Sequence, residues 1–85
     1  MTLEYTKESA KEFKKLDKTV AVRIKKYMDE VAALKDPRSR GKGLVGNLSG
    51  YWRYRVGDYR ILCRIQDDKL VIIVVEIGHR RNVYE

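Results

Sequence analysis

Hydrophobic positions in the first half of the chain follow two different periods. Leu3 and Tyr5 alternate with polar neighbours, which predicts a short strand over about residues 2–6. Apolar residues then recur at helical spacing in two runs, one after Thr6 and one after Asp17, and Asp36-Pro37 ends the second. Because almost no chain separates the two runs, they predict an antiparallel αα-hairpin.

The second half of the chain carries the pattern of strands. A glycine-rich loop is predicted over residues 37–50, followed by strands over about 51–56, 59–66 and 70–77 with short hairpin turns between them. The last strand is apolar on both faces except at Glu76, which predicts a central strand covered on both sides. The order β-α-α-β-β-β predicts one α+β domain over residues 1–85, with two helices on one face of a mostly antiparallel sheet.

Composition excludes several classes of protein. The single cysteine, Cys63, cannot form an internal disulfide, so we expect a protein of the reducing cytoplasm. No apolar run reaches the length of a membrane span, and the first residues do not resemble a signal peptide, so we expect no membrane association. The net charge of +7 favours a polyanionic partner.

Arginines gather in the second half of the chain, whereas lysines dominate the first 35 residues. Arginine is preferred where a planar group must contact phosphate through two hydrogen bonds. If Gly57-Asp58 is a two-residue turn, Arg55 faces Arg60 across the hairpin, and four arginines share one face of the sheet: Arg53, Arg55, Arg60 and Arg64. The opposite face then holds the apolar residues of the core.

Like charges directly opposite each other in an antiparallel pair are unfavourable, and neither strand of this hairpin offers a carboxylate to offset them. The cluster therefore indicates an anionic ligand. A solvated sheet face, whose cations only prevent edge-to-edge aggregation, is the alternative that the sequence leaves open.

Residue types restrict the chemistry further. One histidine and one cysteine argue against a zinc site, no serine has a suitable histidine partner, and the glycines do not form a phosphate-binding fingerprint, so we expect no metal and no cofactor. Arginine, tyrosine and a single histidine suit cleavage of RNA by its own 2′-hydroxyl, where cations stabilise the phosphorane. Residues after Gly78 are expected to lie near Arg60, because the last two strands pair.

Two segments resemble the RelE/ParE toxin superfamily, and within it the RelE branch. They are Tyr51–Leu62, which contains RVGDYRI, and Gly78–Tyr84, which contains GHRRNVY. The N-terminal LEYTKESAKEFKKLDK segment and the loop at Leu44–Asn47 extend the resemblance over the whole chain. It implies the β-α-α-β-β-β layout and a ribosome-dependent, metal-independent endoribonuclease that cuts mRNA in the A site by 2′-hydroxyl attack.

The resemblance also implies roles for individual residues. Arg60 and Arg80 would stabilise the phosphorane, Tyr84 would stack on or orient the nucleotide, and Arg53 or Arg55 would assist proton transfer electrostatically. Relatives carry lysine at the positions of Arg53 and Arg55, so His79 is the better-tuned titratable group here. Contacts with mRNA or ribosomal RNA are expected from Lys42, Arg64 and Arg81.

Family membership implies partners as well. We expect a RelB-like antitoxin that wraps the toxin along an apolar stripe of the second helix and an exposed strand edge, the ribosome with its mRNA and 16S rRNA, and operator DNA only for the toxin–antitoxin pair. Two other functions stay open: a ParE-like inhibitor of DNA gyrase without nuclease activity, and a noncatalytic module that binds RNA or the ribosome.

Overall fold

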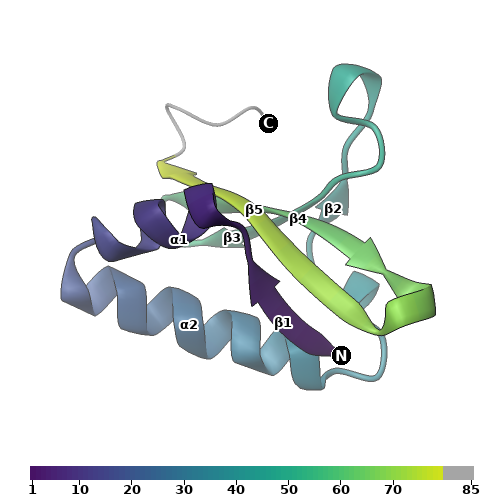
Figure 1. The fold of residues 1–85 in the computed structure, drawn as a ribbon, viewed down its shortest axis with the longest axis horizontal. Helices are drawn as coiled ribbons and strands as arrows, with labels where there is room; N and C mark the ends of the chain where they lie inside the picture. The colour runs from purple at the N-terminus through teal and green to yellow at the C-terminus, as the bar shows by residue number, and fades with distance from the viewer. Residues whose placement is uncertain (80–85) are drawn as a thin grey trace.

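A computed structural model describes residues 1–79, which form two helices and a five-stranded sheet (Figure 1). The elements in chain order are β1 (Thr2–Tyr5), α1 (Lys7–Lys14), α2 (Lys18–Ala33), β2 (Lys42–Gly43), β3 (Trp52–Val56), β4 (Tyr59–Gln66) and β5 (Val71–His79). The α+β fold with two helices packed on a mostly antiparallel sheet is therefore confirmed.

Both helices begin directly after the residues that precede the two predicted runs, Thr6 and Asp17, and each of these residues caps its helix. The Thr6 side chain accepts a hydrogen bond from the Ser9 amide at 3.1 Å, and Asp17 accepts one from the Thr19 amide at 3.2 Å. Such oxygens satisfy amides that the first helical turn leaves without a partner. α2 begins shortly after α1 ends, so the two helices form the predicted αα-hairpin.

The strand order is β1-β5-β4-β3-β2, with β1 parallel to β5 and all other pairs antiparallel. β5 is thus internal in the sheet, as predicted. Its Ile72, Val74 and Ile77 are buried, but Ile73 and Val75 are only half-buried. Both helices pack against the first face, and the second face is only partly covered.

The hydrophobic core lies between α2 and the sheet. Ile24, Met28 and Val31 form the inward stripe of α2 and are fully buried against β3 and β4, where Tyr54 and Ile61 are also inaccessible to solvent. Each of these aliphatic side chains contributes roughly 1.5–3 kcal/mol of hydrophobic stabilisation when it is buried. The face of the sheet away from α2 carries the arginines.

Two local predictions need correction. The loop predicted over residues 37–50 contains a short strand, β2, which pairs with Trp52 and Arg53 of β3. The short turn predicted between the last two strands is a 3-10 turn over Asp67–Lys69 followed by Leu70 in a left-handed conformation (φ +55°), so β5 begins at Val71. Neither segment shows a periodic pattern of hydrophobic residues in the sequence, because each is too short to bury one of its faces.

The segment that leads into β2 is held against β3 by side chains of the core. The indole Nε1 of Trp52 donates to the Arg40 carbonyl at 2.7 Å, and the Tyr54 hydroxyl donates to the Pro37 carbonyl at 2.7 Å. Gly41 follows at φ +80°, where a Cβ would lie 2.5 Å from the Arg53 carbonyl oxygen. Only glycine permits this close approach, which fixes β2 beside the arginines of β3.

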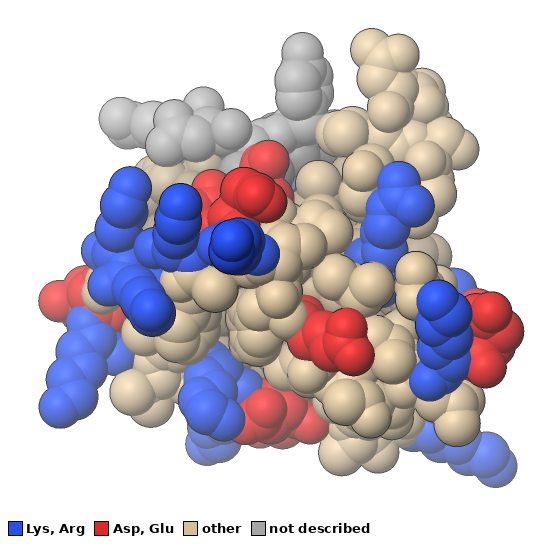
Figure 2. Space-filling view, in the orientation of Figure 1, with Lys and Arg blue, Asp and Glu red and all other residues tan. Residues whose placement is uncertain are grey.

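Lysines lie mainly on the helices. Figure 2 shows blue side chains gathered over α1 and the start of α2, where α1 alone contributes Lys7, Lys11 and Lys14. Carboxylates lie among them, as is usual for a solvated helix surface. Within the described part of the chain no helix has the length and apolar character needed to cross a membrane.

Candidate nucleic-acid interface

Cations from three strands share the sheet face that points away from α2, and we call this surface the arginine face. The β3–β4 hairpin pairs Val56 with Tyr59 and Arg55 with Arg60, as the sequence predicts. Gly57 makes the tight turn possible with φ +58°. Alternation of side chains and the β2–β3 register then place these residues on the arginine face: Lys42, Arg53, Arg55, Arg60 and Arg64.

Two of these arginines are buried. Arg53 is 6% exposed and Arg60 is 5% exposed, whereas Arg55 is accessible to solvent. Arg53 lies between β2 and β4, and Arg60 lies between β3 and β5, so both side chains have a strand on either side. Charged residues are rarely buried to this extent without a partner that compensates for lost hydration.

The loss of hydration on burial affects the electrostatics of Arg53. Its Nε is buried and has no hydrogen-bond partner within residues 1–79. Burial and then the positive charge of Arg55 lower the pKa of the Arg53 guanidinium below its usual range. This is the direction expected of a cation that lacks water and lies beside another cation, and an anion bound here would remove both penalties.

Arg64 lies on the arginine face but away from the Arg55–Arg60 pair, and Lys42 lies on it beside Arg53. The Arg64 guanidinium stacks 4.7 Å from the centre of the Tyr51 ring and donates to the Tyr51 hydroxyl at 3.2 Å. Four residues of strand separate it from Arg60, a distance of about 13 Å. Lys42 is exposed and lies opposite Arg53.

His79 is not brought together with the arginines. It pairs with Tyr59 across β4 and β5, and the two rings meet edge to face with their centres 5.5 Å apart. Tyr59 packs against the hydrophobic core, so His79 lies on the helix side of the sheet. The prediction that groups His79 with Arg60 did not take account of this alternation.

The last described residues reach the Arg55–Arg60 pair. Gly78 is the register partner of Arg60, which agrees with the expected course of the chain. Arg80, Arg81 and Tyr84, which the sequence also singles out, lie outside the described residues.

Glu76 is the residue on this face that sequence reasoning missed. It is the register partner of Leu62, and therefore shares a face with Arg60, because the bulge between Leu62 and Cys63 shifts the pairing of β5. Burial and then the charge of Glu12 raise the pKa of the Glu76 carboxyl. None of the ion pairs within residues 1–79 includes it. Its interruption of an apolar run was the only signal in the sequence.

Residues 1–79 give little support for chemistry that depends on a bound metal ion or a reactive thiolate. Residues 1–79 contain no group of three or more histidine, cysteine or acidic side chains placed to hold a metal ion. Cys63 is fully buried, and burial raises the pKa of its thiol, which disfavours the reactive thiolate. The arginine face therefore offers cations and hydrogen-bond donors, which bind phosphate and stabilise negative charge.

Comparisons with known proteins agree with this fold. The family model of the ParE toxin of type II toxin–antitoxin systems, parDE, matches residues 3–84. The chain is 33% identical to the mRNA interferase toxin RelE of Escherichia coli over 79 residues, which cover 92% of this chain and 81% of that protein. It is 34% identical to toxin RelG of Mycobacterium tuberculosis over 50 residues, 59% of this chain and 58% of that protein.

Solved structures show the same architecture. The toxin–antitoxin complex RelBE2 of Mycobacterium tuberculosis contains a chain with a TM-score of 0.84 and 25% identity, covering 95% of this chain and 92% of that one. The isolated RelE toxin of Escherichia coli gives a TM-score of 0.76 at 25% identity, over 92% of this chain and 82% of that one. The chain belongs to the RelE/ParE superfamily, the toxins of type II toxin–antitoxin systems.

Proposed function

We propose that this toxin is an endoribonuclease that cuts mRNA in the ribosomal A site without a metal ion. The observation that carries the proposal is the register pair Arg55–Arg60, with Arg53 two residues further along the same face. Three guanidinium groups within one hairpin match a phosphodiester that gains negative charge in the transition state. The relatives named mRNA interferase support the same reaction.

The proposed step uses the substrate's own nucleophile. The 2′-hydroxyl gives its proton to solvent and attacks the neighbouring phosphorus, the bond to the 5′-oxygen breaks to leave a 2′,3′-cyclic phosphate, and that oxygen takes a proton from solvent. Arg60 and Arg80 stabilise the phosphorane, Tyr84 orients the nucleotide, and Arg55 assists proton transfer through its charge. We give His79 no role in this step, since its ring packs edge to face against Tyr59.

Arg53 is still a cation at neutral pH, although its pKa is lowered. We therefore assign it phosphate binding rather than proton removal. Lys42, Arg64 and Arg81 are proposed to contact RNA around the cut site, with Arg64 and Tyr51 presenting a stacked pair to a base or a sugar.

A translating extract tests the reaction. Purified toxin is added with and without a chelator, and mRNA 5′ ends are mapped; Arg55→Gln is the variant, since Arg55 is exposed and its loss leaves the core intact. The proposal expects cuts within codons only when ribosomes are present, unaffected by chelator and abolished in the variant. Cuts in naked RNA, or no cuts at all, would contradict it.

The name of the matching family model favours a second candidate, a ParE-like inhibitor of DNA gyrase. That function requires binding but no cluster of guanidinium groups around one phosphate. Intact mRNA together with blocked DNA supercoiling would support this alternative, and Arg55→Gln would then leave inhibition nearly unchanged.

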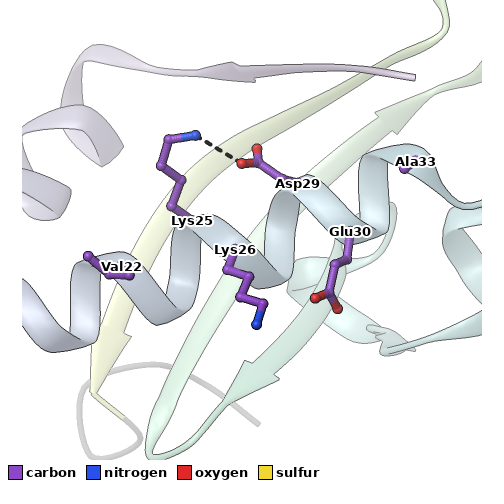
Figure 3. Close-up of a pocket in the computed structure, with 6 residues that line it drawn as sticks. All are labelled: Val22, Lys25, Lys26, Asp29, Glu30 and Ala33. Carbon is purple, nitrogen blue, oxygen red and sulfur yellow. Dashed lines mark hydrogen bonds and ion pairs between the residues drawn. The ribbon is translucent and has the colours of Figure 1, made fainter.

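We also propose an antitoxin partner, since the RelBE2 relative was solved as a toxin–antitoxin complex. The inward apolar stripe of α2 is core, and its outward face is mixed: Figure 3 shows Lys25 paired with Asp29, and also Lys26 and Glu30, together with the apolar Val22 and Ala33. We place the antitoxin at the edge strand β1, because a hollow of about 420 Å³ beside it is lined by Leu3, Tyr5, Ala10 and Phe13, with Lys14, Lys25 and Asp29 completing the lining. Operator DNA is expected to bind only the toxin–antitoxin pair.

A further inference from the structure

Another hollow lies on the arginine face, beside Arg53, and we call it the loop pocket. It has a volume of about 460 Å³ and lies between β3 and the segment after β2. Its wall includes Lys42, Leu44, Val45, Asn47, Leu48 and Arg53. The volume falls within the roughly 300–1,000 Å³ that is usual for small-molecule sites.

Arg53 and Lys42 form a wall that the loop pocket shares with a smaller hollow of about 270 Å³. The smaller hollow is lined on its other side by Arg55, together with Tyr27 and Gly41. Every charged side chain that lines either hollow is a cation. The two hollows therefore share positively charged lining residues, Lys42 and Arg53.

The buried Nε of Arg53 points to an anionic ligand at these shared lining residues. Arg53 is 94% buried, and its Nε has no acceptor within residues 1–79. Leaving such a donor unpaired is unfavourable, and a phosphate oxygen supplies the missing acceptor. Two residues of strand separate Arg53 from Arg55, about 7 Å, which is comparable to the spacing of neighbouring phosphates along a nucleic-acid strand.

The other wall of the loop pocket has a different character. Leu44 and Leu48 are half-buried, and Val45 is 87% exposed although it is aliphatic. Asn47 adds a side-chain amide, which can donate to and accept from the edge of a base. A phosphate alone needs no apolar wall, whereas a nucleotide has an anionic end and a flat apolar end.

We propose that the loop pocket binds the nucleotide next to the scissile phosphate of the RNA, with Arg53 and Lys42 on its phosphate and Leu44, Val45 and Asn47 around its base. This inference rests on the proposed function for the identity of the ligand. It makes Asn47 a residue that determines which base is accepted beside the cut. An acidic peptide is the competing occupant, but it would leave the apolar wall without a flat partner.

A binding experiment tests the pocket without requiring cleavage. The probe is a trinucleotide RNA whose central 2′-hydroxyl is replaced by hydrogen, titrated into the full chain and followed by NMR at the Asn47 side-chain amide and the Arg53 Nε–H. Both signals are expected to shift. Asn47→Ala should weaken binding about fivefold, the equivalent of one neutral hydrogen bond, and Val45→Glu should weaken it further through repulsion.

Ser49→Ala is the matched control, because it lies in the same segment but outside the pocket wall. Shifts confined to Arg55 and Arg60, or shifts at Asn47 produced by a glutamate-rich peptide but not by the RNA, would overturn the proposal. Cleavage mapping separates this result from the proposed function. If both signals shift but the wild-type toxin cuts no mRNA, the nuclease proposal fails and the loop pocket remains an RNA site; cutting without these shifts rejects the pocket alone.

Discussion

Arg55 and Arg60 lie directly opposite each other across the β3–β4 hairpin, so two positive charges are held in register on neighbouring strands. Such a pair is unfavourable by a few tenths to about 1 kcal/mol in the folded chain. The same pair is the centre of the proposed cleavage site. This arrangement predicts that stability and activity respond in opposite directions when the charge at position 55 is reversed.

Replacing Arg55 by glutamate or by glutamine tests that relationship. Arg55→Glu should unfold at higher urea concentration than Arg55→Gln, because the carboxylate attracts Arg60, with a difference of a few tenths to about 1 kcal/mol in the free energy of unfolding. Both variants should lose toxicity when expressed in cells. Lys35→Glu, an exposed position after α2, controls for the change in net charge and should remain toxic; equal stability of the two Arg55 variants would argue against the charge pair.

Gly41 should be intolerant of a side chain. In Gly41→Ala the new Cβ would meet the Arg53 carbonyl oxygen at 2.5 Å and the Trp52 Nε1 at 2.6 Å, at a backbone φ of +80°. We expect a loss of about 2 kcal/mol or more in the free energy of unfolding, measured in urea.

Gly46→Ala is the matched control for that substitution. Gly46 also has a positive φ, +67°, but a Cβ there would meet nothing within 4 Å. Backbone strain is then the only cost of Gly46→Ala, and it should lower the free energy of unfolding by roughly 1–2 kcal/mol. Equal losses in the two variants would show that the close approach of Gly41 to β3 contributes nothing.

Leu70 is strained as well as exposed. Its φ is +55° and its side chain is 62% accessible to solvent, so the residue gains little from burial and has an unfavourable backbone conformation. Leu70→Gly should therefore raise the free energy of unfolding by up to about 1 kcal/mol, whereas Leu70→Ala, which keeps a Cβ, should not. Thermal unfolding of the two variants measures the difference; a destabilised glycine variant would contradict this account of the turn.

Glu76 should make stability depend on pH. Burial and Glu12 raise the pKa of its carboxyl in the folded chain, so its contribution is fully present below the unfolded pKa of about 4.3 and is lost as pH rises through the folded value. Glu76→Gln has no carboxyl at this position, so the variant does not lose this stability as pH rises. The variant should thus gain stability relative to the wild type between pH 3 and pH 7, as measured by urea unfolding across that range.

Asp67→Asn should show the opposite trend. The Arg38 guanidinium, which donates to both carboxylate oxygens at 2.9 Å, lowers the pKa of Asp67. Its contribution is present above the unfolded pKa of about 3.9 and is lost as pH falls. Relative to the wild type, this variant should therefore lose stability at pH 7 rather than at pH 3, and parallel profiles for the two variants would contradict both assignments.

The sequence predicts those parts of the fold that have a periodic pattern of hydrophobic residues or a recognisable turn. The Gly57-Asp58 turn determines the register of the hairpin, and therefore the pairing of Arg55 with Arg60, because a two-residue turn leaves only one alignment. The helix starts after Thr6 and Asp17 were also predictable, because each cap is a hydrogen bond between residues close together in the sequence.

The remaining features depend on contacts between distant segments. β2 is two residues long, and it forms because Gly41 approaches β3 closely, which no local pattern reveals. The bulge at Leu62 and Cys63 brings Glu76 onto the arginine face, and simple alternation could not locate it. Arg53 is buried because β2 lies beside it, so its isolation from water could not be predicted from the sequence alone.

Single-turnover cleavage of mRNA on stalled ribosomes tests the central claim most directly. Wild-type toxin, Arg55→Ala and Arg60→Ala are compared at saturating concentration, with ribosome binding and circular dichroism measured for each variant. The cationic pair predicts that each variant binds the ribosome and remains folded, yet cuts about 10²–10³-fold more slowly. Cleavage at the wild-type rate by folded, ribosome-bound Arg55→Ala and Arg60→Ala would contradict the account.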